Sequence, residues 1–295
     1  MLPSHFTLPQ SRDAGPDVLV SPASVCLSSL LRLLDGIAES LLGLYADRGQ
    51  LAVFNKADKS PLTRADKLSH DQLLDGLRKL AVGIPLISEE SAESELQRRR
   101  EWPVCWMVDP LDGTREFLDG TDAFSVNVAL IVNGRPVLGV VTVPCQDCHF
   151  MGVVGQGAYR IQLGGLIDDA QRLHCRSFDP RSPLVMLASA RHRESMVSAL
   201  KESIEGAMNH PTIRQNQGSA LKFCDLVLGK ADVYPRTTPC YEWDVAAGDA
   251  LVSAAGGAVV DFEGRPLRYN NRDTLLAPPF IAQADRAIRY DGALR

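Results

Sequence analysis

Acidic side chains that could bind a metal ion stand at one short turn of the chain. An apolar run is followed by Asp109, Pro110, Leu111, Asp112 and a glycine. Pro110 keeps the residue before it extended, so we expect the Asp109 carboxylate to project beyond the end of a buried strand. If the turn returns Asp112 and the Leu111 carbonyl to the same side, three hard oxygen ligands meet. Such a set suits magnesium or manganese better than zinc or copper.

A phosphate group could bind beside such a metal site. Gly113 allows the backbone to approach a ligand closely. A helix beginning at Thr114 would direct its first N–H groups and its positive dipole end to the same place. These features favour phosphate chemistry, although an ordinary turn also remains open, because Asp-Pro and Asp-Gly pairs are common in turns.

Two further acidic segments favour the metal site. Glu89 and Glu90 follow an apolar run, and Glu242 and Asp244 flank Trp243 just before a helix of small residues. Each segment alone has a simple structural explanation. Glu90 could be exposed to solvent, and Asp244 could cap the helix. Their occurrence together favours a cluster of carboxylates.

Composition narrows the class of protein. The 295 residues are 45% hydrophobic and 23% charged, with a formal net charge of −5, which is ordinary for a folded chain. The negative charge argues against binding to polymeric nucleic acid, which depends on clustered Lys and Arg. No run approaches the roughly 20 uninterrupted apolar residues of a membrane span, and no secretory signal is evident. We expect a cytoplasmic monomer or homodimer without integral membrane association, and peripheral contact with the inner membrane stays open.

The seven cysteines are expected to be reduced thiols in a chain without an export signal. Cys145, Cys148 and His149 have the spacing of a covalent haem-attachment motif. The match is single, and no second Cys or His pair completes a zinc set. We therefore interpret the segment as a hairpin turn after Pro144.

Helices and strands alternate along the whole chain, which predicts an α+β fold of stacked layers. Thr63 and Asp66 mark a helix start, and Asn133-Gly134 predicts a tight hairpin between two β-branched runs. A polar segment at 164–183 divides the chain into an N-terminal half, residues 1–165, and a C-terminal half, residues 166–295. The predicted strands are 84–87, 104–108, 124–132, 137–143, a pair within 151–161, 184–188, 231–234 and 258–262; the predicted helices lie after 22, at 63–83, from about 193, at 219–228 and at 244–255.

The combination of motifs resembles the inositol monophosphatase superfamily of metal-dependent, lithium-sensitive phosphatases. The segment 109–114, Asp-Pro-Leu-Asp-Gly-Thr, and the segment 243–248, Trp-Asp-Val-Ala-Ala-Gly, are similar to the two signatures of that family. The resemblance runs from about residue 53 to about residue 279 and implies a layered αβαβα fold. Likeness to the CysQ branch, the 3′(2′),5′-bisphosphate nucleotidases, is carried by residues 55–63, 109–117, 218–223 and 231–236.

The resemblance implies a site built on two or three Mg²⁺ ions, for which Mn²⁺ can substitute. The implied metal ligands are Glu89, Asp109, Asp112, Asp244 and the carbonyl of Leu111.

The resemblance also implies the roles of the remaining site residues. Asp58 and Thr114 would orient and deprotonate the attacking water, with Glu89 as a third member of the catalytic set. Backbone groups of Gly113 and Thr114 would hold the scissile phosphate. The implied contacts to the rest of the nucleotide are Ser219, Lys222 and Arg236.

The implied reaction is hydrolysis of a small bisphosphorylated nucleotide, adenosine 3′,5′-bisphosphate, to AMP and phosphate by a metal-activated water, in sulfur metabolism. The same chemistry on an inositol phosphate or on fructose 1,6-bisphosphate stays open. The alternative from another class is a non-catalytic nucleotide- or haem-binding module.

Overall fold

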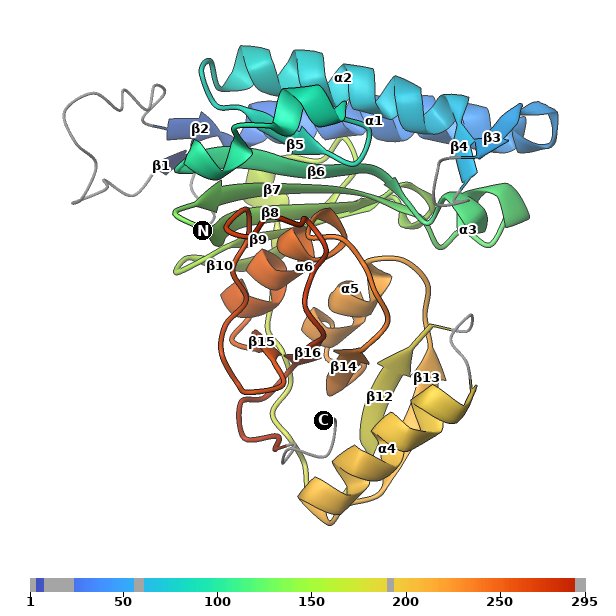
Figure 1. Ribbon diagram of the computed structural model, residues 1–295, viewed down its shortest axis with the longest axis vertical. Helices are drawn as coiled ribbons and strands as arrows, with labels where there is room; N and C mark the ends of the chain where they lie inside the picture. The colour runs from blue at the N-terminus through green and yellow to red at the C-terminus, as the bar shows by residue number, and fades with distance from the viewer. Residues whose placement is uncertain (1–3, 8–23, 56–60, 190–193, 290–295) are drawn as a thin grey trace.

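Five layers of helix and sheet are stacked in the computed structural model, which describes residues 4–7, 24–55, 61–189 and 194–289 (Figure 1). Helices α1 (Leu27–Ala46) and α2 (Arg64–Leu80) form the outer layer, above a seven-stranded sheet. Helices α5 (Leu221–Val227) and α6 (Trp243–Ala254) lie between this sheet and a five-stranded one, and α4 (Glu194–Met208) covers the last layer. The predicted layered α+β fold is confirmed.

The seven-stranded sheet has the order β11-β10-β9-β8-β7-β6-β5. All neighbouring strands are antiparallel except β5 and β6, which are parallel. The parallel pair brings the carboxyl ends of two strands to the same edge of the sheet. Its strands are β5 (Leu86–Ser88), β6 (Val104–Asp112), β7 (Ser125–Val132), β8 (Arg135–Val143), β9 (Cys148–Val153), β10 (Gly157–Gln162) and β11 (Gln171–Leu173).

Strand β6 is buried on both faces, which explains its continuous apolar sequence. Val104, Trp106 and Val108 join the core beneath α1 and α2. Cys105 and Met107 join the core around α5 and α6. A strand held from both sides gives the residues that follow it a fixed position.

The second sheet has the order β13-β12-β14-β16-β15 and mixes parallel with antiparallel pairs. In the described part of the chain, two short ribbons, β1–β2 and β3–β4, the helix α3 and five short 3₁₀ turns complete the regular elements. The remaining bounds are β1 (His5–Thr7), β2 (Ser24–Cys26), β3 (Val53–Asn55), β4 (Pro61–Thr63), α3 (Thr114–Asp119), β12 (Leu184–Ala188), β13 (Thr212–Asn216), β14 (Val233–Arg236), β15 (Ala258–Asp261) and β16 (Phe280–Gln283), with 3₁₀ turns at Arg48–Gln50, Glu93–Leu96, Arg99–Glu101, Pro144–Gln146 and Ile167–Asp169.

Helix α6 packs against the seven-stranded sheet at two glycines. A Cβ atom at Gly139 would lie 2.3 Å from the Ala247 carbonyl oxygen, and one at Gly152 would lie 2.4 Å from the Leu251 Cα. Because both obstacles are backbone atoms, only glycine permits this approach. The helix is therefore held close to the sheet.

Local motifs behave as predicted. Asn133 and Gly134 both have positive φ, 50° and 72°, as a tight hairpin requires. The segment after Pro144 forms a turn between β8 and β9, and both ring nitrogens of His149 already lie 2.9 Å from partners, Thr142 Oγ1 and Asp35 Oδ1. The hairpin interpretation of this segment is confirmed.

The predicted division at residue 165 does not coincide with an edge between sheets. The first sheet continues to β11, and α6, from the C-terminal half, packs against β7, β8 and β9. The two halves thus share a helical layer. Among the described residues, no helix is both long enough and apolar enough to span a bilayer.

Candidate active site

Two carboxylates lie side by side at the carboxyl ends of the parallel strands. Ser88 of β5 pairs with Val108 of β6, and the Glu89 N–H donates to the Val108 carbonyl oxygen over 3.3 Å. Glu89 and Asp109 directly follow these paired residues. The end of the parallel pairing therefore places both acids close together, although β6 continues to Asp112, beyond its predicted end at residue 108.

The turn after Asp109 leaves the regular ladder. The pairing between β6 and β7 is irregular between Asp109 and Asp112, as expected for a proline, which cannot donate a ladder hydrogen bond. The Leu111 N–H donates to Asp109 Oδ1 over 3.1 Å. Gly113 then has a φ of +88°, in the region that favours glycine, and α3 begins at Thr114 as predicted.

The Asp112 carboxylate is fixed from the second half of the chain. Its Oδ2 accepts hydrogen bonds from the Ser219 hydroxyl and the Ala220 N–H, both at 2.6 Å, and from the Asn127 amide at 3.3 Å. The Ser219 hydroxyl lies 2.8 Å from that of Ser125. All three donors contact the same carboxylate oxygen of Asp112, Oδ2.

Asp244 reaches the same region from the first turn of α6. Its Oδ2 accepts a hydrogen bond from the Tyr241 N–H over 3.1 Å. Since α6 is pressed against the sheet by the two glycines, the position of Asp244 follows from helix packing.

These segments border one cavity of about 350 Å³. The four carboxylates named by the sequence all line it, although they come from three distant parts of the chain. The lining residues are Glu89, Asp109, Leu111, Asp112, Gly113, Thr114, Arg236, Pro239, Cys240, Tyr241, Trp243, Asp244 and Leu276.

The carboxylates repel one another. Burial first, and then the charges of Glu89, Asp112 and Asp244, hold the pKa of Asp109 well above its usual range. Burial and the charge of Asp112 raise the pKa of Asp244 to about 7. Concentrated negative charge of this kind is what a divalent cation would neutralise.

The donor chemistry of the cavity fits a hard cation. Its candidate ligands are carboxylate and carbonyl oxygens. Cys240 also lines the cavity, but burial, with the negative charges of Asp244 and Asp112, raises its pKa to about 12, so it stays a neutral thiol rather than a soft thiolate ligand. Within the described ranges, no three His, Cys, Asp or Glu side chains are already arranged to hold an ion, so the carboxylates border the cavity without enclosing it.

Thr114 contacts Asp66, which the sequence predicted only as part of a helix start. Its hydroxyl lies 3.0 Å from Asp66 Oδ1 and 3.2 Å from the Leu111 carbonyl oxygen. Asp66 is buried, and this burial raises its pKa. The predicted partner of Thr114, Asp58, lies outside the described residues.

The sequence did not predict Asp66 as a site residue, because the helix-start motif accounts for only one of its two carboxylate oxygens. Oδ2 accepts from the Thr63 N–H and hydroxyl in the predicted capping box, while Oδ1 faces Thr114. A cap normally lies near solvent, and here the acid is only 2% exposed. Sequence gives no signal for that burial.

The three predicted nucleotide contacts differ in their placement. Arg236 lines the cavity, whereas Ser219 and Lys222 are not among its lining residues. Ser219 donates to Asp112, and the buried Lys222 ammonium donates to the carbonyl oxygens of Ser219 and Gln217 over 2.7 and 3.2 Å. Burial lowers the pKa of Lys222 to about 8. In this arrangement Lys222 supports the segment that holds Asp112.

A layered α+β scaffold with an acidic cavity at the ends of buried strands defines a class suited to cation-assisted hydrolysis. The profile of the inositol monophosphatase family matches residues 29–289. The 3′(2′),5′-bisphosphate nucleotidase CysQ of Escherichia coli K12 is 37% identical over 254 residues, covering 86% of this chain and 98% of that protein. The CysQ protein of Buchnera aphidicola is 32% identical over 88% of this chain and 93% of its own length.

Solved structures of the same family also resemble this chain. The crystal structure of CysQ from Bacteroides thetaiotaomicron, described as a bacterial member of the inositol monophosphatase family, superposes with a TM-score of 0.73 at 34% identity, covering 88% of this chain and 98% of that one. The extragenic suppressor protein suhB of Bartonella henselae gives 0.70 at 25% identity, covering 89% and 94%. The chain belongs to the inositol monophosphatase family, and the predicted phosphatase class is confirmed.

Proposed function

We propose that this protein is a Mg²⁺-dependent 3′(2′),5′-bisphosphate nucleotidase that hydrolyses adenosine 3′,5′-bisphosphate to AMP and phosphate. The observation that carries the proposal is the cavity that Glu89, Asp109, Asp112 and Asp244 line together with Thr114 and Arg236. The similarity to the CysQ nucleotidases supports the choice of substrate.

The acidic side of the cavity would hold the cations. Glu89, Asp109, Asp112, Asp244 and the Leu111 carbonyl are the residues that would bind two or three Mg²⁺ ions. When bound, the ions would polarise the phosphoryl oxygens and lower the pKa of water.

Thr114 and Asp66 supply a route for the proton of the attacking water. Because the Thr114 hydroxyl donates to Asp66 or to the Leu111 carbonyl, its oxygen can accept a hydrogen bond from water in the cavity. Asp66, with its raised pKa, can take up the proton through Thr114. The water is thereby oriented and deprotonated without a covalent enzyme intermediate.

Arg236, which lines the same cavity, would bind the substrate's second phosphate. The Arg236 guanidinium is fixed by the Tyr234 hydroxyl at 3.3 Å and by the carbonyl oxygens of Thr238 and Pro239, both at 3.4 Å. A positioned guanidinium suits bidentate binding of a phosphate.

A substrate panel tests the proposal. Phosphate release is measured from adenosine 3′,5′-bisphosphate, inositol 1-phosphate and fructose 1,6-bisphosphate, each with Mg²⁺ and with chelator. We expect the highest kcat/KM for the nucleotide and no turnover in chelator. A preference for inositol 1-phosphate or the sugar bisphosphate would refute the substrate, and metal-independent turnover would refute the mechanism.

A further inference from the structure

Glu242 is a buried carboxylate to which the reaction assigns no role. Its side chain is only 1% exposed. The neighbouring Tyr241 and Asp244 line the active-site cavity, but Glu242 does not. Its carboxylate instead contacts residues 270–277, a segment between β15 and β16.

Both oxygens of Glu242 are engaged by this segment. Oε2 accepts from the Asn270 N–H over 2.7 Å, and Oε1 accepts from the Arg272 guanidinium over 2.9 Å. The same guanidinium nitrogen donates to the Leu276 carbonyl oxygen. The Glu242–Arg272 pair therefore joins the loop at residues 240–242 to both ends of the segment.

Backbone pairing completes the attachment. The Glu242 N–H donates to the Leu275 carbonyl oxygen and the Ala277 N–H donates to the Cys240 carbonyl oxygen, both over 2.8 Å. Tyr241 and Leu276 form an antiparallel bridge between these bonds. The side chains of this bridged pair both line the active-site cavity.

A second buried charge, Arg99, contacts the same segment. Its guanidinium donates to Asn270 Oδ1 over 3.0 Å and to the carbonyl oxygens of Arg272 and Asp273 over 2.8 and 2.6 Å. The Asn270 amide donates back to the Arg99 carbonyl oxygen over 2.6 Å. Asn270 has a φ of +55°, a conformation that these bonds stabilise.

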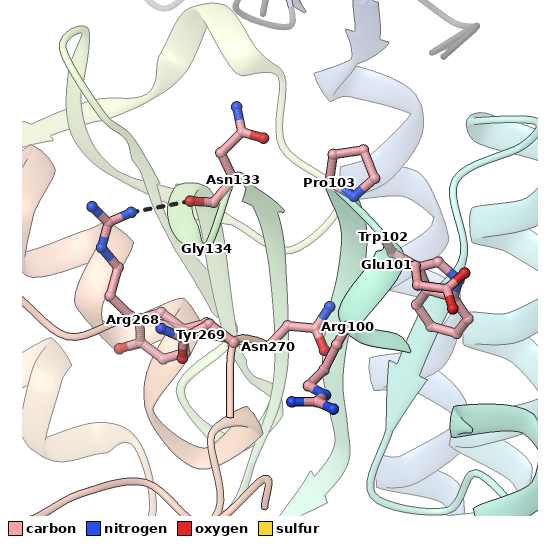
Figure 2. Close-up of a pocket in the computed structure, with 10 residues that line it drawn as sticks. Arg100, Glu101, Trp102, Pro103, Asn133, Gly134, Arg268, Tyr269 and Asn270 are labelled. Atoms are coloured by element: carbon pink, nitrogen blue, oxygen red, sulfur yellow. Dashed lines mark hydrogen bonds between the residues drawn. The ribbon is translucent and has the colours of Figure 1, made fainter. Parts of the chain in front are cut away.

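Figure 2 shows Asn270, one member of this attachment. Asn270 lies between Tyr269 and Arg100 in the lining of a second cavity of about 510 Å³, which shares no lining residue with the active-site cavity. Arg268, in the lining of that cavity, donates to the Asn133 carbonyl oxygen. Arg268 and Arg272, which precede and follow Asn270 by two residues, thus have different partners.

Such a network resists partial rearrangement. A buried charge that loses one hydrogen-bonding partner keeps its desolvation cost without compensation. Residues 270–277 and 240–242 should consequently move as one unit. Tyr241, stacked on Trp243 at 4.5 Å with an interplanar angle of 11°, and Leu276, 40% exposed, would then present a fixed aromatic and apolar wall.

We propose that Glu242 and Arg272 are positioning residues that fix the Tyr241–Leu276 wall against the nucleoside of the substrate. The inference rests on the proposed function, since a nucleoside is the part of that substrate that an aromatic wall can contact. Neither residue is among those that line the cavity where the phosphate would bind, so the wall should govern substrate affinity rather than chemistry.

The test compares two substrates in matched variants. Arg272→Met removes the charge and both donor contacts, Arg272→Lys retains a cation that can donate to Glu242 and Leu276, and Glu242→Gln weakens the pair from the other side. Arg268→Met is the control, because it makes the same chemical change four residues away. Each protein is assayed on adenosine 3′,5′-bisphosphate and on p-nitrophenyl phosphate, which has no nucleoside.

We expect Arg272→Met and Glu242→Gln to raise KM for the nucleotide about tenfold, the size of a lost charged hydrogen bond, with kcat nearly unchanged. Both constants for p-nitrophenyl phosphate should stay at wild-type values. Arg272→Lys should recover most of the affinity, and Arg268→Met should resemble wild type. The fluorescence of Trp243, on which Tyr241 stacks, provides an independent readout. The nucleotide concentration that gives half of the fluorescence change should be about tenfold higher for Arg272→Met than for wild type.

Other outcomes overturn the proposal. Equal losses on both substrates, or loss of kcat with unchanged KM, would mean that the pair supports the fold or the chemistry instead. If Glu242→Gln fails to fold, the Arg272 series and the fluorescence titration decide. Should the wild type show no preference for the nucleotide over p-nitrophenyl phosphate, the substrate assignment itself would fail; Arg272 variants with wild-type nucleotide affinity would sink only the positioning role.

Discussion

Replacing Asp244 with asparagine should stabilise the metal-free protein while removing its response to Mg²⁺. The pKa of Asp244 is raised from 3.8 to about 7 by burial and by the charge of Asp112. At about 1.4 kcal/mol per pH unit, keeping this carboxyl ionised at pH 8 costs about 4 kcal/mol. The side chain is partly exposed and titrates together with neighbouring carboxylates, so we expect about half, about 2 kcal/mol. Asparagine keeps an oxygen for the Tyr241 N–H and loses the charge.

The pH dependence follows from the raised pKa. Between about pH 4 and pH 7, folded Asp244 holds a proton that the unfolded chain has released, so wild-type stability falls as pH rises through this window. Asp244→Asn should therefore match wild type near pH 4 and exceed it by about 2 kcal/mol near pH 8, which is about 5 °C in Tm. Adding Mg²⁺ should raise the Tm of wild type and leave the variant almost unchanged.

Thermal unfolding followed by circular dichroism, in chelator and in Mg²⁺ across this pH range, measures both effects. Asp71→Asn, an exposed site on α2, controls for the loss of one charge. A variant that is less stable than wild type in chelator near pH 8, or a Tm difference that does not vary with pH, would refute the repulsion. Equal Mg²⁺ stabilisation of both proteins would refute Asp244 as a ligand.

Three further substitutions test other parts of the site. Thr114→Val should lower kcat by about 10²-fold or more with little change in Tm, because it interrupts the proton route to Asp66; Thr121→Val is the control, and wild-type turnover would contradict the route. Gly152→Ala should destabilise by about 1–3 kcal/mol in chemical denaturation and weaken Mg²⁺ binding, because its Cβ displaces α6; unchanged stability would contradict the close packing. Burial lowers the pKa of Lys222 in the folded protein from 10.5 to about 8, so the buried charge destabilises wild type below about pH 8 and this destabilisation falls as pH rises toward 10.5. Lys222→Met should remove it, and the stability advantage of the variant should shrink across this interval. A stability difference between the two proteins that is independent of pH over this interval would contradict the burial of a charged lysine.

Local sequence patterns predicted the elements that carry most of the site. Strands β6, β7 and β8 have continuous apolar sequences or a recognisable turn, and these features depend on neighbouring residues only. The edge strand β13 and the strand β16 were not predicted. Strand β13 is polar over Arg214 to Asn216, and β16 follows two prolines and is defined by pairing with β14 and β15. Pairing between distant segments has no local signal.

The candidate site shows the same limit in its side chains. The acids of the turn at 109–114 could be predicted from the local sequence, because Pro110 and Gly113 restrict the backbone there. The link between Asp66 and Thr114 spans 48 residues, and the contact of Ser219 with Asp112 spans 107. Such partners are chosen by packing of α2 and α5 on the sheet. Sequence can propose which residues are chemically competent, while the structure decides which of them meet.

One helix on each face of the sheet explains why the acids are held in mutual repulsion. On one face, α2 contacts three site segments from positions spaced i, i+3 and i+4: Asp66 contacts Thr114, Ser69 donates to the Pro110 carbonyl oxygen over 2.6 Å, and His70 lies 2.9 Å from the Ser88 hydroxyl. On the other face, α6 is pressed close by two glycines and carries Asp244. Neither helix can withdraw without losing buried contacts, so the carboxylates cannot separate to relieve their charge. Protonation, which the raised pKa values of Asp109 and Asp244 favour, or cation binding would then lower the free energy of the site. Under the proposed function, metal affinity would depend on the packing of both helical layers.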